Sequence, residues 1–292
     1  MSRPVADRWL DISTDPPRPP FITPGPRRAT MADYETIEVT RTGAVARLAF
    51  DRPDAHNALD RRMAEELVDA AHDLVSDDGV RCLALTGNGP AFNTGADLTT
   101  LVGDGTDEGR LRGLAGHLHE FVGSLLRTPK PVVTGVNGVA AGGGLGPALC
   151  GDVVLVAEGA RLEFAYPRIG LSGDGGSTYL LPRLVGLRRA QELAVRDEPV
   201  SGREAVDVGL ATERVPDDEL DERLAAEAER LAAGPTRAYG ATKRLLHRSF
   251  EQSLERHLGE EADAIAGLTN TDDYARGHAT FGDNEDPEFV GE

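Results

Sequence analysis

Short apolar runs alternate with amphipathic helical stripes along the first half of the chain, and this alternation restricts its fold more than any other feature. Helical stripes cover residues 59–75 and 107–127, and a short apolar helix is expected to begin at glycines 142–144. Strands that alternate with helices are typical of an α/β fold. The runs typical of strands cover residues 37–39, 44–50, 80–85, 131–134 and 152–156.

Beyond about residue 186 the pattern is almost wholly helical. We therefore expect an α/β core over residues 31–235 and a C-terminal helical region over residues 236–292. Residues 1–30 hold seven prolines and no hydrophobic periodicity, so a disordered tail is expected there. The helical stripes of the second half cover residues 187–195, 202–208, 217–233, 236–250 and 253–267.

Charge and cysteine content disfavour several classes of partner. The 292 residues carry 31 Lys and Arg against 49 Asp and Glu, and the net charge of −18 disfavours nucleic acid. No apolar run reaches the ~20 residues that span a bilayer, so no membrane partner is expected. Cys82 and Cys150 lie in apolar runs, which favours free thiols in a reducing cytoplasm. Lysine occurs only at Lys130 and Lys243, and the acid excess favours a salt-rich cytoplasm. A GC-rich genome would explain the few lysines but not the acids.

The common cofactor and metal motifs are missing, so neither a metal nor a separate cofactor is expected. Neither lysine follows the glycines of a P-loop, and no glycine run completes a dinucleotide fingerprint. Asp174 replaces the last glycine of a nucleophile elbow. His117 and His119 are two residues apart on an expected helix, so they do not share a face.

Two glycine-rich loops follow predicted strands, at residues 87–97 and 137–146. Glycine lets a backbone approach a ligand closely, and a helix start directs unpaired N–H groups toward it. Two converging loops of this kind would form an oxyanion hole of main-chain donors. Tight turns without a chemical role are the alternative.

Three segments in order are RPDAHNAL at residues 52–59, LTGNGPAFNTGADL at residues 85–98, and PVVTGVNGVAAGGG at residues 131–144. Together they resemble the enoyl-CoA hydratase/isomerase family, also called the crotonase superfamily. Segments at 169–179, 181–186 and 205–211 continue the resemblance, which spans roughly residues 34–290. The motifs are specific for the superfamily but not for the reaction.

The resemblance implies a crotonase-like spiral of ββα units with a C-terminal α-helical oligomerisation region that builds homotrimers or homohexamers. It implies an acyl-CoA thioester as the substrate, with CoA arriving as part of that substrate. The shared chemistry is stabilisation of a thioester enolate, and by motif the backbone N–H groups of Ala96 and Gly143 would hold its oxygen.

The resemblance also implies where CoA is held. For His56, a plain surface turn is the alternative role. Residues 274–281 resemble the family's final helix, whose aromatic residue covers CoA, often from a neighbouring subunit. The implied CoA contacts are Asp54, Ala55, His56, Ala96, Asp97, Leu98 and Phe281.

Two departures from the family pattern bear on the reaction. Family hydratases add water with two glutamates, and by register these positions fall on Gly146 and Arg168, neither of which is a carboxylic acid. Glu163 lies five residues before Arg168. In an extended stretch that odd spacing would direct the two side chains to opposite faces.

Asp174 is the replacement candidate, because it lies where several family isomerases and the aryl-CoA dehalogenases place their working aspartate. One carboxylate beside an enolate can remove a proton at one carbon and return it at another. A helix N-cap is the alternative role, since residues 175–181 could begin a helix. Dehalogenation is disfavoured because it relies on an indole, and the one tryptophan, Trp9, lies in the tail.

We therefore expect a cytoplasmic acyl-CoA enzyme, with an enoyl-CoA isomerase favoured. Asp174 would move the proton while Ala96 and Gly143 hold the thioester oxygen. Two alternatives stay open. The first is an enoyl-CoA hydratase that uses Asp174 and Glu163 in unusual roles, and the second is a non-catalytic acyl-CoA-binding or assembly protein.

Overall fold

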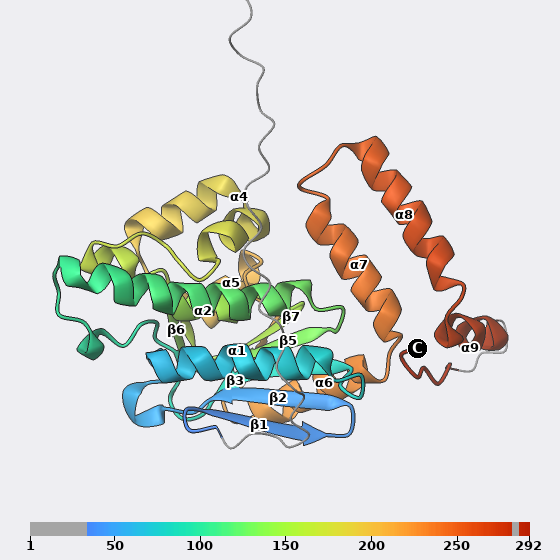
Figure 1. The fold of residues 1–292 in the computed structure, drawn as a ribbon, viewed down its shortest axis with the longest axis horizontal. Helices are drawn as coiled ribbons and strands as arrows, with labels where there is room; N and C mark the ends of the chain where they lie inside the picture. The colour runs from blue at the N-terminus through green and yellow to red at the C-terminus, as the bar shows by residue number, and fades with distance from the viewer. Residues whose placement is uncertain (1–33, 282–285) are drawn as a thin grey trace, which may run out of the picture. The chain divides into compact units, whose positions relative to one another are not determined.

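The computed structural model describes residues 34–281 and 286–292, so the predicted tail at residues 1–30 lies outside the described residues. Two sheets form the centre of the described part (Figure 1). The larger, in spatial order, contains β1 (Ile37–Thr42), β2 (Val45–Phe50), β3 (Cys82–Gly87), β5 (Val132–Val136), β7 (Val153–Ala157) and β10 (Glu213–Val215). The smaller contains β4 (Ala91–Asn93), β6 (Val139–Ala141), β8 (Arg161–Glu163) and β9 (Val200–Ser201).

From β3 to β8 the strands alternate between the two sheets, and each pair is followed by a helix. The chain runs β3, β4, α2, then β5, β6, α3, then β7, β8, α4. Neighbouring strands are parallel except for the β1–β2 and β8–β9 pairs, which are antiparallel. This arrangement confirms the expected spiral of ββα units. The helices are α1 (Arg61–Ser76), α2 (Glu108–Arg127), α3 (Leu145–Leu149), α4 (Ser177–Arg196), α5 (Gly202–Asp207), α6 (Leu220–Ala232), α7 (Thr236–Arg248), α8 (Leu254–Leu268) and α9 (Asp272–Thr280).

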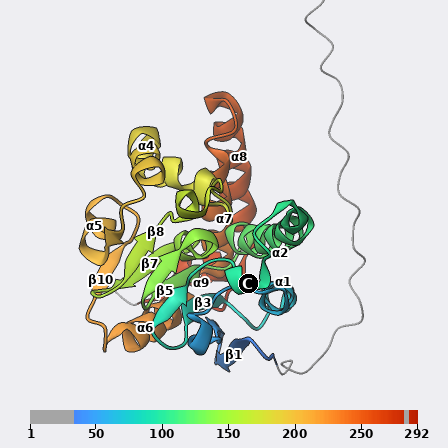
Figure 2. The same cartoon turned by 90° about the vertical axis from the view of Figure 1, so that its left-hand side faces the viewer.

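Helices cover both faces of the larger sheet, and its inner strands β3, β5 and β7 are largely apolar for that reason. Helices α1 and α2 pack side by side on one face, whereas α6 packs on β3 and β5. Figure 2 shows the strands between these two layers. Helices α7 and α8 pack on each other, and every residue of α8 keeps some exposure. Among the described residues, no helix combines the length and apolar character needed to cross a bilayer.

The smaller sheet was not predicted, and neither was β10 in a region expected to be helical. Strands β4 and β6 lie inside the two glycine-rich loops, and each has only three residues. Such runs are too short to show the period of a strand. Helix α4 begins ten residues before the predicted stripe at 187–195. Gly186, with a φ of 74°, interrupts its helical backbone, which is why the stripe is visible only beyond it.

Both lysines of the chain are buried and donate to acceptors of the protein itself. Lys130 Nζ donates to the carbonyls of Leu74 and Asp77 at the C-terminal end of α1, at 2.8 and 2.6 Å. Lys243 Nζ, on α7, lies 2.8 Å from Asp152 Oδ2 and 3.0 Å from the carbonyl oxygen of Leu125 on α2. Each ammonium group therefore joins segments that are far apart in the sequence.

We predict that Lys243→Met lowers the free energy of unfolding by about 2–3 kcal/mol, because it removes charged hydrogen bonds and leaves Asp152 without its cation. Urea unfolding followed by circular dichroism measures the change. Arg237→Met, on an exposed position of the same helix, is the control and should change stability little. Equal stability of both variants would contradict the anchoring role of Lys243.

Candidate active site

The first glycine loop lies alongside the segment that precedes α1. The N–H of Leu59 donates to the carbonyl of Gly95 at 2.7 Å, and the N–H of Asp97 donates to the carbonyl of Leu59 at 2.9 Å. Ala96, between these two partners, forms a parallel bridge with Leu59. In a parallel ladder the residue between two bonded neighbours directs its own N–H away from that strand. The amide of Ala96 is therefore free of this pairing.

The two glycine loops meet backbone to backbone. A Cβ added at Gly95 would lie 2.9 Å from the amide nitrogen of Gly143, and one added at Gly143 would lie 3.9 Å from the amide nitrogen of Ala96. Gly143 is the middle residue of the short helical turn Gly142–Gly144, so its N–H has no partner within that turn. The structure thus brings the two predicted donors together.

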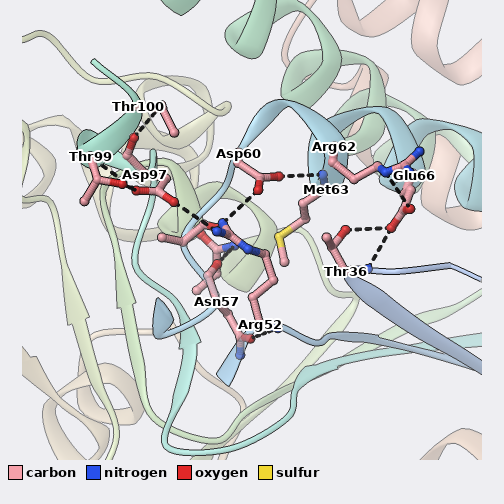
Figure 3. A network of polar contacts seen from close by, with 12 residues as sticks. Thr36, Arg52, Asn57, Asp60, Arg62, Met63, Glu66, Asp97, Thr99 and Thr100 are labelled. Carbon is pink, nitrogen blue, oxygen red and sulfur yellow. Dashed lines mark hydrogen bonds and ion pairs between the residues drawn. The ribbon is translucent and has the colours of Figure 1, made fainter. Parts of the chain in front are cut away.

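An arginine fixes the loop that carries Ala96 to the start of α1 (Figure 3). Arg52 forms ion pairs with Asp97 at 3.0 Å and with Asp60 at 3.2 Å, and it donates to the carbonyl oxygen of Ala58 at 2.5 Å. Asp60 is also the N-cap of α1, accepting from the amide of Met63 at 2.8 Å. Hydrogen bonds from Thr99, together with Arg52, lower the pKa of the Asp97 carboxyl. Asp97 is therefore ionised and engaged within the protein.

The other implied CoA residues fall into two groups. Asp54, Ala55 and His56 lie in the turn beside this network, where the carbonyl of His56 accepts from Thr94 Oγ1 at 3.2 Å. The side chains of Asp54 and His56 are exposed, and Leu98 is 48% exposed. Phe281 follows α9 and is 90% exposed, so the single described chain does not bring its ring to this surface.

Asp174 lies in the loop before α4, and its side chain is not the helix cap. Gly176 occupies the N-cap position of α4, and toward this helix Asp174 offers only its backbone carbonyl, which accepts from the Ser177 amide at 3.1 Å and from Ser177 Oγ at 2.7 Å. The carboxylate instead contacts Nε2 of His119, on α2. The Asp174 side chain is 33% exposed and that of His119 is 54% exposed. An ionised carboxylate only accepts, so Nε2 carries the hydrogen in this pair.

His119 is the site residue that the sequence analysis missed. It is 55 positions from Asp174, so nothing local links the two. The available signal was its place on α2, three and seven residues before Val122 and Leu126, which share one helical face. His117 behaves as expected, because its Nδ1 lies 2.9 Å from the carbonyl oxygen of Gly113 rather than beside His119.

The loop of Asp174 fills the space where Gly146 would otherwise carry a side chain. A Cβ at Gly146 would overlap the carbonyl oxygen of Gly175. Gly175 in turn lies against Gly143, since a Cβ added to it would be 3.0 Å from the Gly143 carbonyl oxygen. Asp174 is thereby held next to the predicted oxyanion donors.

The expectation that Glu163 and Arg168 point to opposite faces is wrong. Arg168 lies 2.5 Å from Glu163 Oε2 and 2.7 Å from Asp197 Oδ2. The segment between them is not extended, because Ala165 has a φ of 61° and Tyr166–Ile169 forms a helical turn. Glu163 is buried and neutralised by Arg168, with Arg161 at 3.4 Å. It is not a free acid or base.

Asp174 and His119 are among the residues that line a cleft of about 810 Å³. Its walls come from α2, from α7 and from the loop that opens α4. The wall from α2 is formed by Val122, Gly123, Leu126 and Arg127 beyond His119, and the wall from α7 by Gly240, Lys243, Arg244, His247 and Arg248. Burial lowers the pKa of His247, helped by the charge of Lys243, so its imidazole is neutral at neutral pH. The cleft can hold a partly apolar group against the carboxylate of Asp174.

Comparison with known proteins finds relatives that match most of the chain. The chain is 37% identical to the "Probable enoyl-CoA hydratase" of Rhodobacter capsulatus over 88% of its own length and 99% of the relative. It is 33% identical to 1,2-epoxyphenylacetyl-CoA isomerase of Escherichia coli, over 85% and 95% of the two chains. The crystal structure of enoyl-CoA hydratase from Bacillus anthracis matches with a TM-score of 0.83 at 29% identity, over 88% and 100%.

The relatives' names differ in reaction, whereas their fold is shared. The family model described as enoyl-CoA hydratase/isomerase matches residues 40–292. Those residues include both glycine loops, the Asp174 loop and the helices that form the cleft. The chain therefore belongs to the enoyl-CoA hydratase/isomerase family.

Proposed function

We propose that the protein is an enoyl-CoA isomerase that moves a double bond from the 3,4 to the 2,3 position of an acyl-CoA thioester. The observation that carries this proposal is the loop of Asp174. This loop fills the space beside Gly146, the position where family hydratases have their first glutamate. It also offers a single carboxylate, that of Asp174, beside the two predicted oxyanion donors.

In this mechanism the Asp174 carboxylate removes a proton from C2 of the substrate. The electrons move into the thioester carbonyl, whose oxygen becomes negative and accepts hydrogen bonds from the amides of Ala96 and Gly143. Asp174 then returns the proton to C4, and the double bond lies between C2 and C3. His119 holds the carboxylate in place through its Nε2–H.

Hydration by this site is disfavoured on chemical grounds, although the Rhodobacter relative is named a hydratase. Water addition needs a group that activates water as well as one that gives a proton to C2. Gly146 supplies no carboxylate, and Glu163 is buried in ion pairs with Arg168 and Arg161. Asp174 alone would have to serve both steps.

Other features support the expected cellular setting and assembly. Burial raises the pKa of the Cys82 and Cys150 thiols to about 12, consistent with free thiols in the cytoplasm.

We propose that a second copy of the chain covers the apolar face of α8, as in a homotrimer or homohexamer. Leu254, Leu258 and Ile265 on that helix are 66%, 52% and 71% exposed.

Asp174→Asn tests the proposed base. We predict that turnover of a 3-enoyl-CoA, followed by the rise in absorbance of the conjugated thioester, falls about 10²–10⁴-fold. Affinity for the 2-enoyl-CoA product should stay within a few-fold of wild type, because the amide is nearly isosteric with the carboxylate. Asp218→Asn, an exposed loop position, is the control. Unchanged turnover in the Asp174 variant would leave the non-catalytic binding protein as the better explanation.

Gly143→Ala tests the main-chain donors. The variant keeps its backbone N–H, but the added methyl group would lie 3.3 Å from Leu118 and 3.9 Å from the amide nitrogen of Ala96, where we expect it to displace the thioester oxygen from the two donors. We predict a loss of about 10²–10³-fold in kcat, the magnitude of removing one oxyanion donor, with little change in the melting temperature. Gly116→Ala, at an open position of α2, is the matched control. A variant with normal kcat would show that the methyl group does not reach the thioester oxygen, which contradicts the position proposed for that oxygen.

Gly146→Glu restores the residue type of family hydratases. Because even a Cβ at Gly146 overlaps the Gly175 carbonyl, we predict a lower melting temperature, loss of isomerase activity and no gain of hydration. Hydration is measured as the fall in absorbance of a 2-enoyl-CoA. A stable variant that hydrates a 2-enoyl-CoA would show that residues 173–176 can move to accommodate the glutamate. That result would contradict the close packing of this loop against Gly146.

A further inference from the structure

The cleft that Asp174 lines is formed by one face of α2, one face of α7 and the segment that opens α4. Its residues on α2 recur at three- and four-residue intervals from His119 to Arg127, and those on α7 recur in the same way from Gly240 to Arg248. None of the implied CoA contacts lines this cleft. Since CoA is assigned to the loops around Asp54 and Leu98, the proposed function gives this cleft, which Asp174 lines, to the acyl group.

The cleft has an excess of positive charge in a chain of net charge −18. Its two acids are engaged: Asp174 contacts His119, and Glu251 accepts from the Tyr179 hydroxyl at 3.3 Å. Arg248 pairs with Glu260 at 2.9 Å, and Lys243 pairs with Asp152. Among the described residues, no carboxylate lies within 4.0 Å of the two remaining cations, Arg127 and Arg244.

The position of Arg127 depends on a glycine one helical turn away. A Cβ at Gly123 would lie 2.7 Å from a guanidinium nitrogen of Arg127, so the missing side chain is what lets the guanidinium lie there. Gly123 is four residues, about 6 Å along the axis, from His119. Arg244 lines the same cleft from α7, opposite α2.

We propose that the acyl group of the substrate ends in a carboxylate, which Arg127 and Arg244 bind, so that the substrate is a short monothioester of a dicarboxylic acid. This rests on the proposed function. A guanidinium matches a carboxylate with two parallel hydrogen bonds, so two unpaired arginines form a site for one. The distance of about one helical turn from His119 to Gly123 favours a short chain between the reacting carbons and the carboxylate.

The test compares binding of adipyl-CoA and hexanoyl-CoA by isothermal titration calorimetry. Both are saturated six-carbon thioesters that cannot be isomerised, and they differ only in the terminal carboxylate. The expected result is roughly tenfold tighter binding of adipyl-CoA by the wild type. Arg127→Gln and Arg244→Gln, singly and together, should remove that preference and leave hexanoyl-CoA affinity unchanged. Arg237→Gln on the exposed side of α7 should keep it.

Two results would overturn the proposal. One is equal affinity of the wild type for the two thioesters. The other is an equal loss of affinity for both thioesters and for free CoA in the arginine variants, which would assign the arginines to the phosphates of CoA. Because the measurement needs no turnover, a preserved carboxylate preference without isomerisation of any 3-enoyl-CoA would reject only the proposed function.

Discussion

Close packing of three glycine-containing loops is the constraint on which the site depends. The loops at residues 93–97, 141–146 and 173–176 touch through their backbones. A side chain would overlap a neighbouring main-chain atom at Gly144, where it meets the Asn93 carbonyl, and at Gly146, where it meets Gly175. Because no side chains separate the loops, the amides of Ala96 and Gly143 lie near each other and Asp174 is brought beside them. The two sheets supply the frame, since β4 and β6 lead directly into these loops.

The same packing links the identity of the acid to the shape of the loop. A carboxylate on α3 at position 146 and the present course of residues 173–176 exclude each other sterically. The backbone course of residues 173–176 that positions Asp174 is therefore different from the course that a glutamate at position 146 would require. A change of reaction within such a fold involves the loop as well as the reacting side chain, which is consistent with one fold serving several reactions.

Much of the fold follows from the sequence, and the exceptions have local physical causes. The strands of the larger sheet other than β10 carry clear apolar runs, the helices from α5 to α8 carry clear helical periodicity, and the motifs identify the family. The three-residue strands are set by their neighbours rather than by their own pattern. Of the candidate site, the two glycine loops were predictable from the sequence. The contact between Asp174 and His119 was not, because it depends on the packing of α2 against a distant loop. The Arg168–Glu163 pair depends on the left-handed backbone of Ala165, a conformation that alanine rarely adopts.

Both lysine side chains are buried and hydrogen-bonded, so every exposed side-chain cation of this protein is an arginine or a histidine. Acyl-CoA thioesters are activated acyl donors, and lysine amines are the side chains that they modify without the help of an enzyme. A guanidinium stays protonated and is a poor acyl acceptor. Lys243, the lysine that lines the cleft, has its amine bound to Asp152 and to the Leu125 carbonyl, and the amine of Lys130 is bound at the end of α1. The surface that meets these thioesters thus offers no free lysine amine for self-acylation.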